Sequence, residues 1–72
     1  MDIQKKVGRR VRELRNEKKV SQEALAFDAD VERAYVSHLE NGERNISIKN
    51  MEKVINALGI SFSEFFNTKT FK

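Results

Sequence analysis

Apolar residues recur along the chain at the three- and four-residue spacing of α-helices. Ile3, Val7, Val11 and Leu14 form the stripe of a first helix, which should fade near residues 18–20. No stretch alternates apolar and polar residues over several positions, as a half-buried strand would. The pattern therefore predicts an all-α protein.

The second and third predicted helices are short and lie close together in the sequence. Ser21 is a suitable N-cap, because its hydroxyl can accept a hydrogen bond from a free backbone N–H. The apolar face that follows is small and consists of Leu25, Ala26 and Ala29. A third helix should cover residues 32–41 and turn Val36 and Leu39 inward. A tight turn at residues 28–31 would give this pair the spacing of a helix-turn-helix.

Two more helices are predicted in the second half of the chain. Asn41-Gly42 is a helix stop signal, since glycine tolerates positive φ. After a loop at residues 43–46, Ser47 should cap a fourth helix, whose core stripe is Ile48, Met51, Val54, Ile55 and Leu58. The capping box Ser61-x-x-Glu64 should then open a short fifth helix that carries Phe62, Phe65 and Phe66. We expect one compact domain over residues 1–66 and a frayed tail over residues 67–72.

Composition excludes several classes of function. A chain of 72 residues buries only a thin core, so a function should lie on the surface or between subunits. Without cysteine, and with His38 as the single histidine, no thiolate or histidine-rich metal site is available, and we expect neither metal nor cofactor. No nucleophile–base pair and no glycine-rich phosphate loop point to an enzyme. No segment approaches the ~20 apolar residues of a membrane span, and a cytoplasmic location is expected.

Charge is distributed unevenly along the chain. The net charge is +3, but residues 1–20 hold eight Lys/Arg and three acids, whereas residues 21–43 hold one arginine and six acids. Residues 44–72 are basic again, with five Lys/Arg and two acids. The basic balance favours a polyanionic partner, while solvated helix faces are the alternative explanation.

Four stretches resemble the Cro/C1-type (XRE) helix-turn-helix family with its spacing: GRRVRELR at 8–15, VSQEALA at 20–26, YVSHLENG at 35–42 and ALGI at 57–60. More loosely, GERNISI at 42–48 and MEK at 51–53 resemble the controller proteins of restriction–modification systems. The resemblance implies a five-helix lambda-repressor-like domain and a homodimeric transcriptional regulator on a pseudo-palindromic DNA operator. RNA polymerase would be a further partner, and the bound protein would associate with the bacterial nucleoid.

The resemblance places the second helix of the motif in the major groove, where its exposed residues meet base edges. Arg33 is the first candidate for base contact, because a guanidinium can donate two hydrogen bonds to guanine. Ala34 could offer a methyl contact, and Ser37 and His38 could reach a base or a phosphate. For Tyr35, base or phosphate contact and packing at the helix junction are equal alternatives.

Other residues are expected to hold the DNA backbone without reading sequence. The candidates are Ser21 and Gln22 at the start of the second helix, Arg44 and Asn45 after the third helix, and Lys49. Many family members also have a partly buried ion pair at the positions of Arg15 and Glu40. We expect that pair to be structural.

The end of the chain holds more large apolar side chains than one small core needs. We expect part of the cluster Ile60, Phe62, Phe65 and Phe66, with the outer face of the fourth helix, to form a two-fold dimer interface. The alternative is that all four side chains cap the core.

Three positions depart from the family pattern. Lys19 and Asp30 stand where glycine is most common, and Glu32 replaces the usual Ser/Thr cap of the recognition helix. The acidic middle segment keeps a second hypothesis open, in which the same domain is a protein-binding adaptor or an antitoxin. Binding to DNA should weaken steeply with salt, whereas an apolar protein interface should not.

Overall fold

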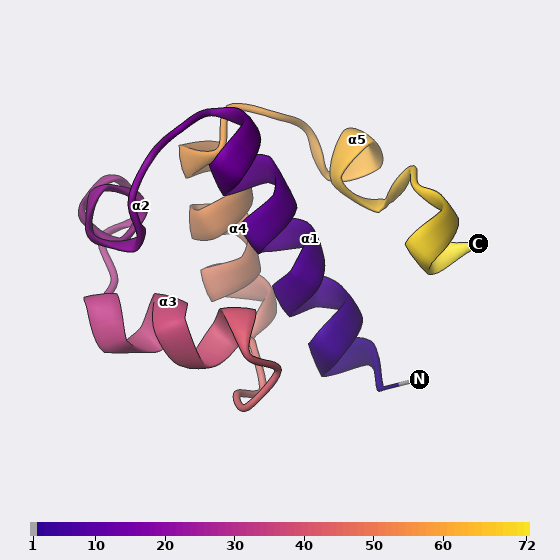
Figure 1. Cartoon of the computed structure of the whole chain (residues 1–72), viewed down its shortest axis with the longest axis horizontal. Helices are drawn as coiled ribbons and strands as arrows, with labels where there is room; N and C mark the ends of the chain where they lie inside the picture. Colours follow the sequence, from indigo (N-terminus) through magenta and orange to yellow (C-terminus); the bar gives the residue numbers. More distant parts are fainter. Residues whose placement is uncertain (1) are drawn as a thin grey trace.

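The computed structural model describes residues 2–72, so Met1, where the expected domain begins, lies outside the described residues. Within this range the chain folds into five α-helices without strands, which confirms the predicted all-α class. The helices are α1 (Ile3–Glu17), α2 (Gln22–Ala29), α3 (Arg33–Glu40), α4 (Ile48–Ala57) and α5 (Phe62–Phe66), and a 3-10 turn, η1 (Lys69–Phe71), follows them (Figure 1).

Local side-chain caps begin four of the five helices. The predicted caps Ser21, Ser47 and Ser61 accept hydrogen bonds from the backbone N–H three residues later, at 3.0–3.1 Å. Asp2 similarly accepts from the N–H of Gln4 at 2.9 Å and begins α1. A cap of this kind contributes about 1 kcal/mol to helix stability. Only α3 starts without one, because Glu32 makes no capping hydrogen bond.

Left-handed residues end the first two helices, at the positions where the family has glycine. Lys19 and Asp30 both have a φ of 58°. The N–H of Val20 bonds to Arg15 O, and that of Val31 bonds to Ala26 O, as in a Schellman motif. The backbone is therefore left-handed at both positions, although neither residue is glycine.

The core lies between α1 and the other four helices. Its fully buried members include Leu25, Leu39, Ile55, Leu58 and Phe65. The predicted stripe of α4 is wrong at its first position, because Ile48 is 84% exposed. Ile48 is the first residue of α4, and the helix reaches the core only from Met51 onward.

Part of the tail expected to fray over residues 67–72 forms a packed turn in the structure. Lys69–Phe71 form one 3-10 turn, and the Phe71 ring packs edge-on against Phe66 with 4.9 Å between centroids. Phe71 also lies 6.1 Å from the Phe65 ring. Aromatic contacts of this geometry hold the turn against α5.

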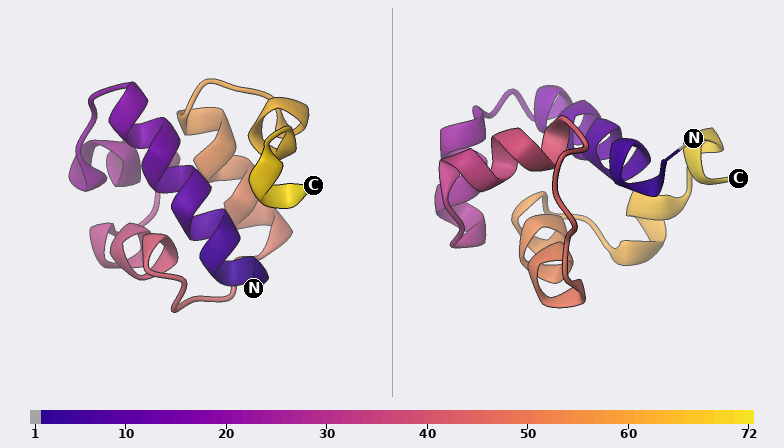
Figure 2. Two further views of the ribbon diagram at one scale, coloured as in Figure 1. Left: turned by 45° about the vertical axis from the view of Figure 1, so that its right-hand side comes forward. Right: turned by 90° about the horizontal axis from the view of Figure 1, so that it is seen from below.

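Helices α2 and α3 form the predicted helix-turn-helix at one end of the molecule, and α1 packs beside α3 (Figures 1 and 2). Gly8 permits that contact: a Cβ there would lie 2.3 Å from Leu39 O and 2.8 Å from Glu40 O. Along residues 2–72, no helix is both long enough and apolar enough to cross a membrane.

Candidate nucleic-acid interface

The outward face of α3 holds most of the residues predicted to contact bases. Val36 and Leu39 are buried, as predicted, and hold the helix on the core. Their burial leaves Arg33, Ala34 and His38 exposed on the other face, with Ser37 half-buried beside them. The structure therefore brings four of the five predicted side chains together on one exposed helix.

Tyr35 is the exception, and its burial favours the second of its two alternatives, packing at the helix junction. Its side chain is buried, and within the described chain its hydroxyl has no hydrogen-bond partner. The guanidinium of Arg44 lies over the ring, 5.2 Å from its centroid, which is cation–π geometry. In this conformation Tyr35 packs at the junction and its hydroxyl does not reach a base.

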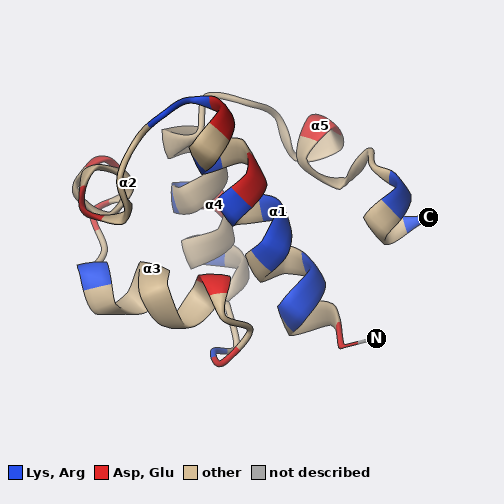
Figure 3. Cartoon of the chain, viewed as in Figure 1, with Lys and Arg blue, Asp and Glu red and all other residues tan. Residues whose placement is uncertain are grey.

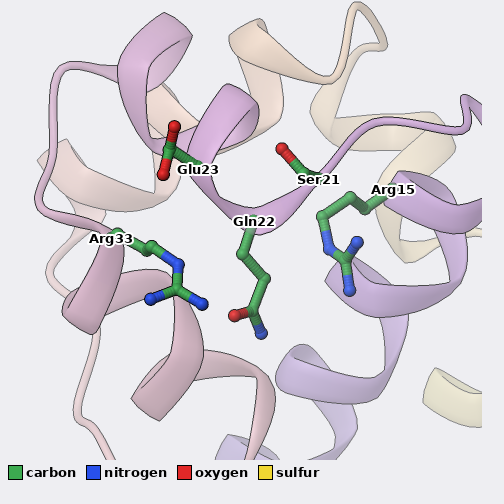
Figure 4. Close-up of a pocket in the computed structure, with 5 residues that line it drawn as sticks. All are labelled: Arg15, Ser21, Gln22, Glu23 and Arg33. Carbon is green, nitrogen blue, oxygen red and sulfur yellow. The ribbon is translucent and has the colours of Figure 1, made fainter.

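A hollow of about 360 Å³ lies at the N-terminus of α2, between α1 and α3. Arg15, Ser21, Gln22, Glu23 and Arg33 line it, and Gln22 lies between the two guanidinium groups (Figure 4). The free N–H groups of the helix start favour an anion, whereas the charge of Arg15 is already balanced by Glu40. This hollow has the chemistry of a phosphate site, with the carboxylate of Glu23 as its one opposing charge.

The buried carboxylate of Glu40 bonds two of the residues that line this hollow. Glu40 accepts hydrogen bonds from Arg15 Nε at 2.6 Å and Nη2 at 3.1 Å, and from Gln22 Nε2 at 3.2 Å. Arg12 Nε lies 3.3 Å from the same carboxylate. The predicted Arg15–Glu40 pair is thus present as part of a larger network that joins α1, the start of α2 and the end of α3.

Burial and hydrogen bonding act in opposite directions on Glu40. Burial alone would raise the pKa of the carboxyl, but the hydrogen bonds from Arg15, Gln22 and Arg12 outweigh it and leave the pKa below its ordinary value. The hydrogen bond to Glu40 likewise raises the pKa of Arg15. The pair is therefore charged at neutral pH and fixes the orientation of Gln22.

A second cationic group lies across α3 from this hollow. Arg33 and Glu40 are seven residues apart and share one side of the helix, whereas Tyr35 lies about 200° from Arg33 around the axis. Arg44, stacked on Tyr35, therefore flanks the other side of α3. In the same loop, the Asn45 side chain accepts a hydrogen bond from Gln4.

Lys49 is exposed in the first turn of α4. Arg44, with Asn45 in the same loop, thus flanks one side of α3, and Ser21 and Gln22 flank the other. An exposed helix between two such edges matches a major groove between two phosphate strands.

The cluster predicted for the dimer interface divides in the structure. Phe65 is fully buried in the core of its own chain, so it belongs to the part of the cluster that offers no surface to a second copy. Ile60 and Phe66 are half-buried, and Phe62 is 40% exposed at the start of α5. Only these three side chains still offer surface to a second copy.

Sequence reasoning missed the partners of two arginines and the exposure of one phenylalanine. Arg12 joins the Glu40 network and donates to Asn41 Oδ1 at 2.9 Å. Arg10 donates to the backbone carbonyls of Glu64 and Phe65 and ties α1 to α5. Phe27 is 85% exposed on α2. The spacing Arg12-x-x-Arg15 could have indicated that both reach one carboxylate, but the other contacts depend on tertiary structure.

An exposed helix of a helix-turn-helix, flanked on both sides by cationic groups, defines the class of DNA-binding domains. The sequence matches the helix-turn-helix family over residues 11–65. The chain therefore belongs to this family, in its Cro/C1 (XRE) type, and is a helix-turn-helix transcriptional regulator, as the sequence resemblance indicated.

Its relatives include control proteins of restriction–modification systems. The chain is 45% identical over 67 residues to the control protein C.MunI of Mycoplasma sp, covering 92% of this chain and 90% of that protein. It is 42% identical over 64 residues to C.BamHI of Bacillus amyloliquefaciens, covering 88% of this chain and 79% of that protein.

Solved structures show the same fold. The controller protein C.AhdI from Aeromonas hydrophila is 44% identical and superposes with a TM-score of 0.87, over 92% of this chain and 100% of that one. C.Esp1396I, solved bound to a 25 base pair operator site, is 33% identical with a TM-score of 0.86, over 92% of this chain and 87% of that one.

Proposed function

We propose that this protein is a controller-type regulator that binds a pseudo-palindromic operator as a homodimer. The observation that carries the proposal is the exposed face of α3 between the Arg15–Arg33 hollow and the Tyr35–Arg44 stack. The operator complex of C.Esp1396I, which shares this fold, supports DNA as the partner. The protein would act in the cytoplasm and associate with the nucleoid when bound.

Base reading belongs to α3 in this proposal. Arg33, at the N-terminus of the helix, enters the major groove and donates to guanine. Ala34, Ser37 and His38 lie along the same exposed face and supply shorter-range contacts. Glu32, also exposed, faces the same groove and suits a cytosine amino group better than a phosphate.

Backbone contacts belong to the two edges of α3. On one edge Ser21 and Gln22 present the start of α2 to a phosphate, and on the other Arg44, Asn45 and Lys49 hold the opposite strand. Because Glu40 already bonds the Gln22 amide, that contact is oriented before DNA arrives. Two subunits would place their α3 helices in half-sites about 34–36 Å apart.

Regulation in this proposal works by occupancy and needs no catalytic step. A bound dimer either blocks RNA polymerase or recruits it from an upstream site. Transcription from a promoter that carries the selected operator, measured with and without the protein, distinguishes the two outcomes.

The direct test is selection of bound sites from random DNA, followed by binding measurements on Arg33→Ala and Arg44→Ala. We expect Arg33→Ala to cost about 1–3 kcal/mol and to relax one base preference per half-site. Arg44→Ala should weaken all sequences about equally, because it holds phosphate. If Arg33→Ala leaves the selected sequence unchanged, the proposed register of α3 is wrong.

A further inference from the structure

We propose that α1 carries a second line of phosphate contacts, the α1 track, formed by Lys5, Arg9 and Arg12. This inference rests on the proposed DNA-binding function and extends it to a helix outside the helix-turn-helix. The three residues are spaced i, i+4 and i+7, so they share one face of α1, and all three are exposed. Figure 3 shows the basic character of α1 against the acidic α2.

The α1 track lies beside the recognition helix. Lys5, Arg9 and Arg12 line a hollow of about 250 Å³ together with Glu40 and Asn41, at the end of α3. Gly8 brings α1 and this end of α3 into backbone contact. The track therefore borders the same helix as the Arg15–Arg33 hollow, further along its length.

Glu40 connects the two hollows. Its carboxylate bonds Arg15 and Gln22, which line the first hollow, and Arg12, which lines the second. Arginine side chains from both hollows thus meet at this carboxylate, in the seam between α1 and α3. This continuity with the proposed interface, together with charge complementarity, selects the DNA backbone as the occupant.

The charges of the α1 track remain available for an anion. Within residues 2–72, Lys5 and Arg9 make no ion pair, and Arg15 already compensates Glu40. Arg12 is held in place by Glu40 and Asn41 while its side chain stays half exposed. By contrast, Arg10 lies on another face of α1, and its guanidinium already donates hydrogen bonds to α5 and Glu13.

The length of the α1 track fits a DNA strand. Seven residues of helix separate Lys5 from Arg12, which is about 10 Å along the axis. Consecutive phosphates of one strand rise by about 3.4 Å along the duplex axis. Three cations over this length can therefore contact more than one phosphate of a strand.

The test compares salt dependence of binding between matched charge-removal variants. Operator affinity is measured by fluorescence anisotropy from 50 to 200 mM salt for the wild type, Arg9→Gln and Lys5→Gln. The controls are Lys18→Gln and Lys69→Gln, which remove the same charge from exposed positions outside the track. Each lost contact should reduce the slope of log K against log salt by about 0.9. The ratio of wild-type to variant operator affinity should therefore fall about 3.5-fold between 50 and 200 mM salt.

A second readout locates the contact on the DNA. In phosphate ethylation interference on the same operator, ethylation at one or two phosphates should weaken binding of the wild type but not of Arg9→Gln. These phosphates should lie next to others whose ethylation still weakens binding of both proteins. The selected base sequence should not change, because the track contacts only phosphate.

Two results would overturn the α1 track. One is a salt slope for Arg9→Gln and Lys5→Gln equal to that of the wild type. The other is an equal reduction in the Lys18→Gln and Lys69→Gln controls, which would indicate general charge attraction. A wild type that binds no selected site would instead refute the proposed function itself, so the two failures are distinguishable.

Discussion

At the scale of single residues, Tyr35 shows how one side chain can act through another. Its hydroxyl is buried without a partner, while its ring supports the Arg44 guanidinium. Burying an unsatisfied hydroxyl costs free energy, so the ring and not the hydroxyl explains what Tyr35 does in this conformation.

We expect Tyr35→Phe to bind operator as tightly as the wild type and to unfold with equal or greater free energy, because only the unpartnered hydroxyl is lost. Tyr35→Leu removes the ring and should weaken binding to all sequences, as Arg44→Ala does. The double variant Tyr35→Leu/Arg44→Ala should bind DNA no more weakly than Arg44→Ala alone, because both changes remove the same contact. Anisotropy titrations on selected and random DNA measure this cycle. Loss of one base preference in Tyr35→Phe would show that the hydroxyl moves to read DNA.

Glu40 is a buried carboxyl group whose pKa is lowered by its hydrogen bonds in the folded state. Its folded-state pKa lies below the ordinary value of 4.5, so the folded state binds fewer protons than the unfolded state when pH falls below neutral. The stabilisation is therefore fully present above about pH 4.5 and is lost as pH falls through the folded pKa.

Glu40→Gln should lower the free energy of unfolding at pH 7 by about 3 kcal/mol, because it leaves Arg15 largely buried without its counter-charge. Its stability should also fall less between pH 5 and 3 than that of the wild type. Urea unfolding at several pH values gives both quantities. Glu13→Gln is the control, since the Glu13 side chain is half exposed and its pair with Arg10 should contribute less than about 1 kcal/mol. Equal pH profiles for wild type and Glu40→Gln would contradict this account.

At the scale of elements, local signals and tertiary contacts explain which predictions succeeded. Ser21, Ser47 and Ser61 act within their own first turn, so the sequence alone locates the starts of three helices. Ile48 has the right spacing for the core, but whether it is buried depends on where α4 enters the fold. Phe71 follows no helical stripe and packs only because α5 brings Phe66 to it.

The candidate site likewise combines features that the sequence predicts with features that depend on tertiary contacts. The exposed face of α3 follows from helical periodicity once Val36 and Leu39 are placed inside. The burial of Tyr35 does not, because it depends on Arg44 from a loop nine residues later. The Arg12–Asn41 contact also joins distant segments, and no local pattern indicates it.

The 3-10 turn η1 offers a prediction at this scale. Phe71→Ala should lower the free energy of unfolding by about 1–2 kcal/mol, because its ring is half-buried against Phe65 and Phe66. Lys72→Ala, at the exposed end of the turn, should change stability by less than about 0.5 kcal/mol. Urea unfolding monitored by circular dichroism compares them, and equal stabilities would mean that the turn is not held by the ring.

At the scale of the whole molecule, basic residues, acidic residues and exposed phenylalanines concentrate on different helices. Lys and Arg predominate on α1, whereas the charged residues of α2 are acidic (Figure 3). Exposed phenylalanine occurs at two places, Phe62 on α5 and Phe27 on α2. Because Phe62 adjoins the half-buried Ile60 and Phe66 at one end of the chain, it is the better centre for an isologous interface.

Phe62→Ser should therefore raise the dimer dissociation constant at least tenfold, since it removes apolar area from the centre of a small interface. Phe27→Ser is the matched control: Phe27 is more exposed, at 85% against 40% for Phe62, yet lies on α2. Sedimentation velocity over a range of concentrations measures both. If Phe27→Ser dissociates the dimer and Phe62→Ser does not, the two-fold axis passes through α2, and α3 could not then occupy two half-sites about 34–36 Å apart as proposed.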